Sequence, residues 1–321
     1  MTTDEVRDDV ELTNLDQELF DGADATKRDL VDYLDAVRDR IIPQLSDRPL
    51  SVIRVLRGQS PFMQKNVPKY TPSWVGTVSY WAEKSKREVA YALCNDRRTL
   101  LWFANQRAIE YHVSLFRVAD DGVPTHLVMD IDPPEGAGFE VVVVAAYAVR
   151  EALEGAGLTG AVKTSGSKGV HIFVPIRPTP VEDVAAGTRA LAARAERIAP
   201  EATTTAFVRE ERGGKVFLDS TRAGGATVVA AYSPRVRPGT PVSYPVAWSD
   251  LAEVHPRDFT LRTALERLGD DDPWTASLPE PQPVPDVLVA EGRDIPIARV
   301  QAMHAGKRRA RERRVADDAQ G

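Results

Sequence analysis

"THLVMDIDPPEG", residues 125–136, ends an apolar run with two closely spaced carboxylates. Successive side chains of a strand point to opposite faces, so Asp130 and Asp132 share one face while Met129 and Ile131 share the other. Two like charges this close repel each other unless a cation lies between them. The stretch therefore indicates either a divalent-cation site or ordinary turn chemistry before the Pro-Pro pair that follows.

The composition narrows the class of protein. A chain of 321 residues can form two domains or one two-lobed unit, and no segment has the roughly 18 consecutive apolar residues of a membrane span. The acidic N-terminus has no apolar signal segment, so we expect a soluble cytoplasmic protein with no membrane association. Because Cys94 is the single cysteine, any metal must be held by oxygen or histidine.

Charge is distributed unevenly along the chain. The net charge of −6 argues against a protein that is basic all over. Between residues 54 and 107, however, ten basic side chains accompany three acidic ones, whereas the first forty residues are strongly acidic. This asymmetry predicts either a lobe that binds a polyanion or a mixed solvated surface.

The first part of the chain predicts one lobe. Residues 1–10 are acidic and are expected to be disordered, and the apolar spacing from Leu30 to Ile41 predicts a helix that Pro43 ends. A β-branched strand, a Pro-punctuated loop, a hairpin, a helix and a short strand with His112 follow. The predicted first lobe spans about residues 11–120.

A second lobe follows over about residues 121–276. It contains the strand of the two aspartates, a helix over about 141–154, a hairpin, another helix and a strand, which gives an α/β (α+β) fold. Residues 141–144 could equally form a strand by propensity. Residues 277–321 are Pro-rich and then basic, and predict a linker and a mobile basic tail.

The hairpin "TSGSKGVHIF", residues 164–173, carries the second signal. Its glycine turn offers backbone N–H groups suited to a phosphate, with Ser165 and Lys168 beside them. On the strand that follows, His171 points away from the apolar side chains. A structurally satisfied histidine and a functional one remain open readings here.

The third signal is "KVFLDST", residues 215–221, where Asp219 ends a strand. Such an aspartate alone is usually a cap, but three strand-end carboxylates, a phosphate-type turn and a histidine together are the components of two-metal phosphoryl transfer. The turn "YSPRVRPG", residues 232–239, adds Arg235 and Arg237, which can hold a triphosphate through bidentate hydrogen bonds.

These motifs, preceded by "LTNLDQELF" and "PFMQKN", resemble the polymerase domain of bacterial ligase D and its stand-alone relatives, within the archaeo-eukaryotic primase superfamily. The resemblance runs from about residue 11 to residue 274. It implies a two-lobed primase-type catalytic core over residues 11–276, with an RRM-like sheet and flanking helices. It also implies a protein that acts at the nucleoid.

Site residues follow from the resemblance by position. It implies that the catalytic and metal-binding residues are Asp130, Asp132 and Asp219, with Mn²⁺ preferred and Mg²⁺ possible. It implies that the nucleotide-binding residues are His112, Ser165, Lys168, His171 and Arg235. It implies that the nucleic-acid-binding residues are Asn14, Lys27, Arg57, Phe62, Lys65 and Asn66. Among these, Phe62 matches an aromatic that stacks on the template, and Asn14 with Lys27 matches a pocket for a downstream 5′-phosphate.

Some positions depart from the family pattern. Gln17 stands where the family usually has a lysine, which predicts a weaker 5′-phosphate pocket. Met63 replaces a second aromatic, and the loop 56–60 looks shorter, which puts strand-end synapsis in doubt. No K-x-D-G adenylation motif is present, so any DNA ligase would be a separate partner of what we expect to be a monomer.

The leading hypothesis is a template-dependent nucleotidyltransferase that fills short gaps or primes, on gapped or primed DNA with a 5′-phosphate, using NTP or dNTP with a preference for ribonucleotides. The alternatives are an end-joining polymerase that acts with a separate ligase, or a non-catalytic nucleic-acid-binding module on an RRM-like sheet. A glycosyltransferase with a D-x-D pair is a further rival, but it gives no reason for Asp219 or for the hairpin of His171.

Overall fold

The structure, a computed structural model, describes residues 3–82, 86–120, 122–223, 226–270 and 272–297. Its main helices are α1 (Lys27–Ala36), α2 (Arg38–Leu45), α3 (Arg97–Asn105), α4 (Phe139–Glu154), α5 (Val181–Ile198), α6 (Pro273–Ser277) and α7 (Asp286–Asp294). Its strands are β1 (Glu5–Arg7), β2 (Val10–Leu12), β3 (Leu50–Arg54), β4 (Phe62–Gln64), β5 (Thr77–Ala82), β6 (Arg87–Ala92), β7 (Ala108–Val113), β8 (His126–Asp132), β9 (Ala161–Thr164), β10 (Val170–Pro175), β11 (Thr203–Thr204), β12 (Val216–Asp219), β13 (Val228–Val229) and β14 (Pro245–Val246).

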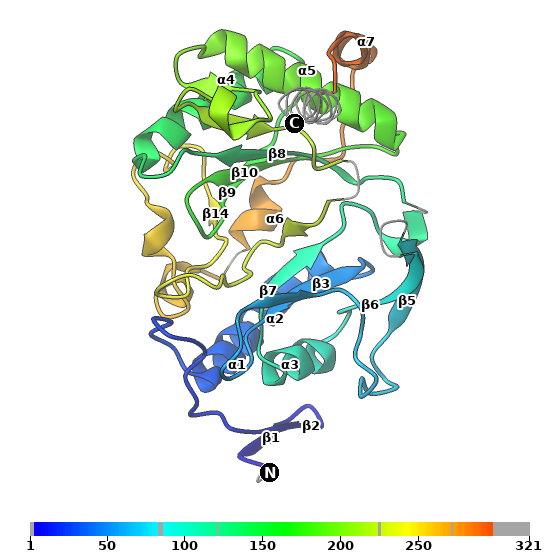
Figure 1. Cartoon of the computed structure of the whole chain (residues 1–321), viewed down its shortest axis with the longest axis vertical. Coiled ribbons are helices and arrows are strands. Elements are labelled where there is room, and N and C mark those ends of the chain that lie inside the picture. The colour runs from blue at the N-terminus through cyan, green and yellow to red at the C-terminus, as the bar shows by residue number, and fades with distance from the viewer. Residues whose placement is uncertain (1–2, 83–85, 121, 224–225, 271, 298–321) are drawn as a thin grey trace, which may run out of the picture.

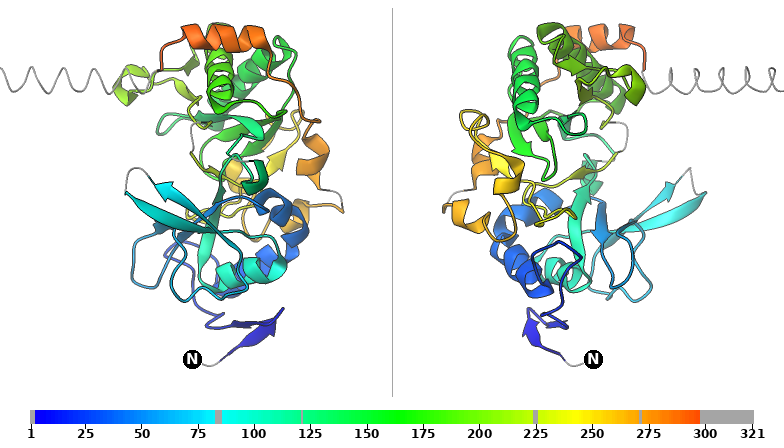
Figure 2. Two further views of the ribbon diagram at one scale, coloured as in Figure 1. Left: turned by 90° about the vertical axis from the view of Figure 1, so that its right-hand side faces the viewer. Right: turned by 60° about the vertical axis from the view of Figure 1, so that its left-hand side comes forward.

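Two sheets lie one above the other in the molecule (Figure 1). The first has the order β13-β7-β3-β6-β5, with β4 paired to β3, and the second has the order β11-β12-β8-β10-β9-β14. Helices α4 and α5 cover the outer face of the second sheet, and α1 to α3 pack around the first (Figures 1 and 2). The other face of the second sheet therefore faces the first sheet.

The second sheet has a strict division between its two faces. Met129 and Ile131 of β8 and Ile172 of β10 are almost fully buried in the main core, which they share with α4 and α5. Val128, on the opposite face, packs against Leu115 and other side chains between the two sheets. Residues 141–144, which could have formed a strand, lie in α4, so a long helical pattern outweighs local β-propensity here.

The two lobes are not consecutive segments of the chain. After β12 in the second sheet the chain returns to the first, where Val228 pairs with Val113 and Val229 with His112. It then goes back to the second sheet as β14. The sequence predicted a single boundary near residue 120, because a two-residue strand gives no periodic signal.

Residues 3–10 are ordered, which corrects the expectation of disorder for them, and residues 1–2 lie outside the described residues. Strands β1 and β2 form a hairpin closed by Asp8 and Asp9, whose φ angles are 47° and 57°. A two-residue hairpin turn of this kind needs positive φ at both central positions, and Asn-Gly is its usual sequence signal. The Asp-Asp pair satisfies the geometry without giving that signal.

The helix expected from Leu30 to Pro43 is two helices. Thr26 and Asp29 form a capping box at the start of α1. The helix is interrupted at Val37, which lies between the end of α1 and the start of α2. Pro43 lies inside α2 and does not end it. The apolar spacing continues through the interruption because both helices bury these side chains, Leu30 and Leu34 in α1 and Ile41 in α2.

The predicted linker contains a docked helix. Residues 286–294 form α7, which packs across α5, and Glu291 pairs with Arg194 at 2.6 Å. The crossing is close at Gly292, where a Cβ would lie 1.8 Å from the carbonyl oxygen of Ala186. The linker prediction is therefore wrong for these residues, and the predicted basic tail from residue 298 lies outside the described residues. Within the described ranges, no helix is both long and apolar enough to cross a membrane.

Candidate active site

A row of polar side chains crosses four strands of the second sheet, on the face toward the first sheet. Lys163 of β9 is paired with His171 of β10, His171 with Asp130 of β8, and Asp130 with Asp219 of β12. Each neighbouring strand contributes the residue directly opposite, so the four side chains line up across the sheet. Strand register thus brings together groups that are up to 89 residues apart in sequence, as Asp130 and Asp219 are.

Asp130 is the centre of this row. Its Oδ1 lies 3.3 Å from His171 Nε2, and its Oδ2 contacts Nη2 of Arg222. The same Nη2 lies 3.0 Å from Oδ2 of Asp219. Burial acts to raise the pKa of Asp130, but the neighbouring His171 and Arg222 outweigh it and hold that pKa well below its usual range. Asp130 is therefore a carboxylate at neutral pH.

Asp132 differs from Asp130 in its environment. It lies at the open end of β8, opposite Phe217, with its side chain about half exposed. Arg212 lies 3.7 Å from it and stacks on the ring of Phe217 at 3.8 Å. Burial, and then the negative charge of Asp130, raise the pKa of Asp132. Repulsion by Asp130 is thus the second contribution to this shift, after burial.

Lys163 fixes the orientation of His171. Its ammonium nitrogen is fully buried, lies 2.9 Å from His171 Nδ1 and donates to Ser243 Oγ at 2.5 Å. Burial and the nearby Arg235 lower the pKa of Lys163 well below its usual value. Nε2 of His171 faces the Asp130 carboxylate, which only accepts, so Nε2 carries the proton. Nδ1 of His171 is therefore the acceptor for Lys163, and Ser243, which donates onward to the Thr164 carbonyl, is the second acceptor.

The glycine turn between β9 and β10 is built around Ser165. Its Oγ accepts hydrogen bonds from the N–H groups of Ser167, at 3.2 Å, and Gly169, at 3.3 Å. Two of the turn's donors are therefore satisfied internally, and the turn offers a phosphate fewer N–H groups than the sequence suggested. Lys168 is exposed beside it, 3.5 Å from Glu135.

Glu110 ties the two sheets together beside this turn. It is buried, and its carboxylate lies 2.8 Å from His112 Nε2 and 3.0 Å from Arg235 Nε while accepting from the N–H of Val236 at 2.8 Å. Burial acts to raise the pKa of Glu110, but the contacts with His112 and Arg235 lower it to about 2. Arg235 also donates to the Ser165 carbonyl, so three of the predicted nucleotide-binding residues meet here.

Most predicted nucleotide-site residues are thus brought together, but four supporting residues were not foreseen. These are Glu110, Lys163, Arg212 and Arg222. Alternation could have found two of them, because Glu110 shares a strand face with His112, and Lys163 lies on the strand before the turn. Arg212 and Arg222 lie outside regular strands in the sequence pattern and carry no such signal.

The side chains fit a divalent cation by the chemistry of the donor set. Carboxylate oxygens of Asp130 and Asp219 face a common cation, which in this structure is the guanidinium of Arg222. Among the described residues, no three histidine, cysteine or acidic side chains already surround one point as metal ligands. Asp130, Asp132 and Asp219 would therefore hold a metal only after Arg222 has moved.

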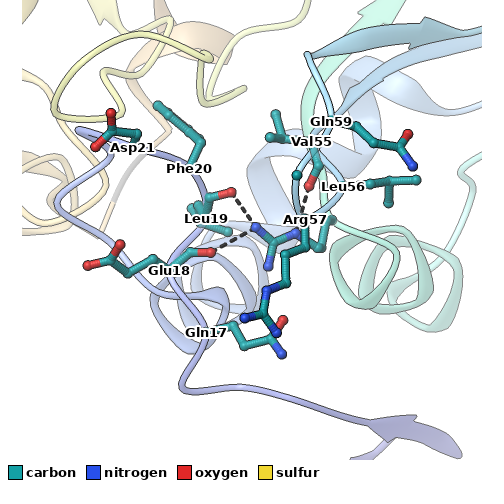
Figure 3. Close-up of a pocket in the computed structure, with 11 residues that line it drawn as sticks. Gln17, Glu18, Leu19, Phe20, Asp21, Val55, Leu56, Arg57 and Gln59 are labelled. Carbon is teal, nitrogen blue, oxygen red and sulfur yellow. Dashed lines mark hydrogen bonds between the residues drawn. The ribbon is translucent and has the colours of Figure 1, made fainter.

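The predicted nucleic-acid residues fall into two groups, and in the first, Asn14, Lys27 and Arg57, only Arg57 lines a cavity of about 530 Å³ (Figure 3). Arg57 lines it together with residues 17–21, Val55 and neighbours up to Gln59, and Arg107. Arg107 donates to the carbonyls of Val55, at 2.7 Å, and Glu18, at 2.8 Å, so it is committed to holding the loops together. Arg57, which is exposed, is the cation that faces solvent there.

Lys27 does not line this cavity. Its ammonium is buried and donates to the Thr13 carbonyl at 2.5 Å, and burial followed by the charge of Arg107 lowers its pKa to about 8. Asn14, the next residue after Thr13, is exposed with a φ of 55°. The structure thus places both residues at one turn but holds the lysine head group inside it.

The second group lies on β4 and the residues after it. Phe62 is 37% exposed and Met63 45% exposed, and Lys65 is exposed next to them. The expected loop is an edge strand at this point, since β4 pairs with β3. Asn66 bonds through its side chain to the backbone of Val67 and Ala90, so it shapes the chain turn.

Comparisons with known proteins identify the family of the chain. The sequence model of the LigD primase-polymerase domain matches residues 26–274. The chain is 31% identical over 265 residues to the bifunctional non-homologous end joining protein LigD of Bacillus subtilis, and 30% identical over 287 residues to the multifunctional protein LigD of Mycolicibacterium smegmatis. These alignments cover 81% and 87% of the chain but 42% and 37% of the relatives, so the chain spans about two fifths of their length.

A solved structure resembles the whole fold. The polymerase domain from Mycobacterium tuberculosis ligase D in complex with DNA superimposes with a TM-score of 0.76 at 30% identity, covering 84% of this chain and 99% of that domain. This match confirms the predicted α+β class and the primase-type architecture. The chain belongs to the family of LigD primase-polymerase domains.

Proposed function

We propose that the protein is a template-dependent nucleotidyltransferase that extends a primer on gapped or primed DNA. The observation that carries the proposal is the polar row from Lys163 to Asp219, with its carboxylates directly beside the turn of Ser165 and Arg235. The names of the relatives, non-homologous end joining proteins, support a role in DNA repair, and the solved relative is in complex with DNA.

In the proposed mechanism each polar group has one task. Asp130, Asp132 and Asp219 hold the metal, which we propose is Mn²⁺ or Mg²⁺ and which, when bound, supplies activation of the primer 3′-hydroxyl and neutralisation of the triphosphate. His171 donates its Nε2–H to Asp130 and so fixes the direction of that carboxylate. Arg235, anchored by Glu110, presents its remaining donors to the triphosphate.

Binding of the nucleic acid would use the surface of the first sheet. Phe62 can stack on a template base, and Lys65 and Arg57 supply charge for the phosphate backbone. Recognition of a downstream 5′-phosphate by Asn14 and Lys27 would be weak. Lys27 already bonds to a carbonyl, and Gln17 supplies no charge.

The test is primer extension on a gapped duplex, with and without the downstream 5′-phosphate, comparing NTP with dNTP under manganese and under magnesium. We expect extension that depends on the template, with a small effect of the 5′-phosphate that fades as the salt concentration rises. Binding without any extension would favour the alternative of a non-catalytic module. A monomer that joins ends only when a separate ligase is added would favour end joining, as the relatives' names suggest.

Replacing His112 with alanine should reduce the preference for ribonucleotides. Because a carboxylate only accepts, His112 donates its Nε2–H to Glu110 and leaves Nδ1 as an acceptor for a ribose 2′-hydroxyl. Losing one neutral hydrogen bond costs about 0.5–1.5 kcal/mol, so the wild type should favour ribose modestly. The measurement is the ratio of kcat/KM for GTP and dGTP opposite a templating C, in the wild type and in His112→Ala.

Two results would contradict this role. One is a wild type that favours dGTP, and the other is a His112→Ala protein that keeps the full ribose preference. A matched control is His255→Ala, since His255 caps a short turn far along the chain and should leave the ratio unchanged.

A further inference from the structure

Arg222 has an unusual position between two acidic side chains. Its Nη2 contacts both Asp130 Oδ2 and Asp219 Oδ2, the latter at 3.0 Å. The contacts of Asp130 and Asp219 with the sheet use their other oxygens. His171 Nε2 lies 3.3 Å from Asp130 Oδ1, and Thr221 donates to Asp219 Oδ1 from its N–H at 2.9 Å and its hydroxyl at 2.6 Å. Within the described residues, one guanidinium nitrogen alone thus joins the two oxygens that face each other.

One hydrogen-bond donor of the Arg222 side chain lacks a partner among the described residues. This donor is Nε, which is buried. A buried N–H group without a partner costs free energy, and this cost makes the position of the side chain less favourable. The side chain is also 29% exposed, so it has a route to solvent. Arg222 is therefore well placed by charge but poorly satisfied by hydrogen bonds, which is what a replaceable cation requires.

We propose that Arg222 is a positioning residue that acts as an internal counter-cation: it holds Asp130 and Asp219 together in the absence of metal and leaves them when a divalent cation takes the two facing oxygens. This inference rests on the proposed function, since it uses two of the same three carboxylates. The exchange leaves the bonds of His171 and Thr221 intact, so the carboxylates need no rearrangement. Arg222 thereby competes with metal and weakens the binding of free metal ions.

The experiment measures Mn²⁺ binding and involves no catalysis. Free Mn²⁺ is followed by its electron paramagnetic resonance signal during titration of the wild type, Arg222→Gln and Arg222→Lys, without nucleotide or DNA. A unit charge near a divalent ion is worth several times the thermal energy, so Arg222→Gln should bind Mn²⁺ about tenfold more tightly or better. Arg222→Lys should keep the wild-type affinity more closely. Arg150→Gln, which removes an exposed arginine paired with Glu154, is the matched control and should change nothing.

Thermal unfolding gives a second readout. In EDTA, Arg222→Gln should melt below the wild type because two facing carboxylates are left without a cation. In saturating Mn²⁺ the gap should close, because the metal then replaces the missing charge in both proteins. Equal or weaker Mn²⁺ binding by Arg222→Gln, or a gap that persists in Mn²⁺, would overturn the proposal.

A double variant separates this inference from the proposed function. Asp130→Asn in the Arg222→Gln background should abolish the tight Mn²⁺ binding. If the double variant binds as tightly as Arg222→Gln, or if no variant binds Mn²⁺ saturably, the carboxylates are not the metal site, and the proposed function fails together with the inference. If Asp130→Asn removes binding but Arg222→Gln leaves it unchanged, only the role of Arg222 fails.

Discussion

Replacing Asp130 with alanine is expected to lower nucleotide incorporation by about a thousandfold or more. A metal held by these carboxylates contributes several kcal/mol of charge stabilisation in the transition state, and each 1.36 kcal/mol corresponds to a factor of ten in rate. Asp130 is the central ligand candidate because it lies between His171 and Asp219 in the row. The measurement is single-nucleotide primer extension with manganese supplied, and Asp132→Ala should behave in the same way.

The fold should survive the Asp130 change. Arg222 keeps Asp219 as a partner, and His171 keeps Lys163, so the loss is about one or two charge-assisted hydrogen bonds, or about 1–3 kcal/mol. Circular dichroism and a melting curve check this point. Extension above a few per cent of the wild type in a folded Asp130→Ala protein would refute the assignment of Asp130.

The second large effect is expected from Gly169→Ala. A Cβ at Gly169 would lie 1.9 Å from the carbonyl oxygen of Ile131 and 3.2 Å from Cδ of Pro133. The oxygen belongs to the strand that carries Asp130 and Asp132, so the methyl group must push β10 away from the acidic end of β8. Overpacking of this kind costs about 1–3 kcal/mol, and a shift of about 1 Å at the reacting groups costs about a hundredfold in rate.

Gly76→Ala is the control for this change. The nearest atom to a Cβ at Gly76 is Leu93 Cβ at 3.7 Å, an ordinary contact, so stability and activity should stay close to the wild type. Denaturant unfolding and primer extension on both variants compare the two glycines directly. A Gly169→Ala protein with wild-type activity would mean that the turn adapts without moving the carboxylates.

Alternation along strands explains why much of the second sheet could be predicted from sequence. Asp130 and Asp132 face away from Met129 and Ile131 as the period of two requires, and His171 lies on the face away from Ile172. Periodicity cannot state which strands are neighbours. The contact of His171 with Asp130 follows from pairing between β8 and β10, which the sequence does not encode locally.

The missed features share a different cause. Arg222 reaches Asp130 from a loop, and α7 is stable because Gly292 allows it to approach α5, so both depend on contacts between distant segments. Lys27 shows the same dependence. The family resemblance implies a phosphate contact for this residue, and the fold holds its ammonium against the Thr13 carbonyl. Composition and motif indicate which residue types are present, while the environment of each head group is a tertiary property.

The single row from Lys163 to Asp219 has a consequence for how the molecule can fail. A pairing error of one residue between β8 and β10 would set Ile172 beside Asp130 and turn His171 under α4 and α5. A buried polar group without a hydrogen-bond partner, as His171 would then be, costs about 1–3 kcal/mol, a sizeable share of the net stability of a domain, about 5–15 kcal/mol. Chains with this misaligned pairing are therefore less stable than the native fold, and a compact but inactive form is disfavoured. The backbone hydrogen bonds between β8 and β10 complete the core, and they also assemble the catalytic row. The fraction of protein that folds should therefore equal the fraction that has an intact site.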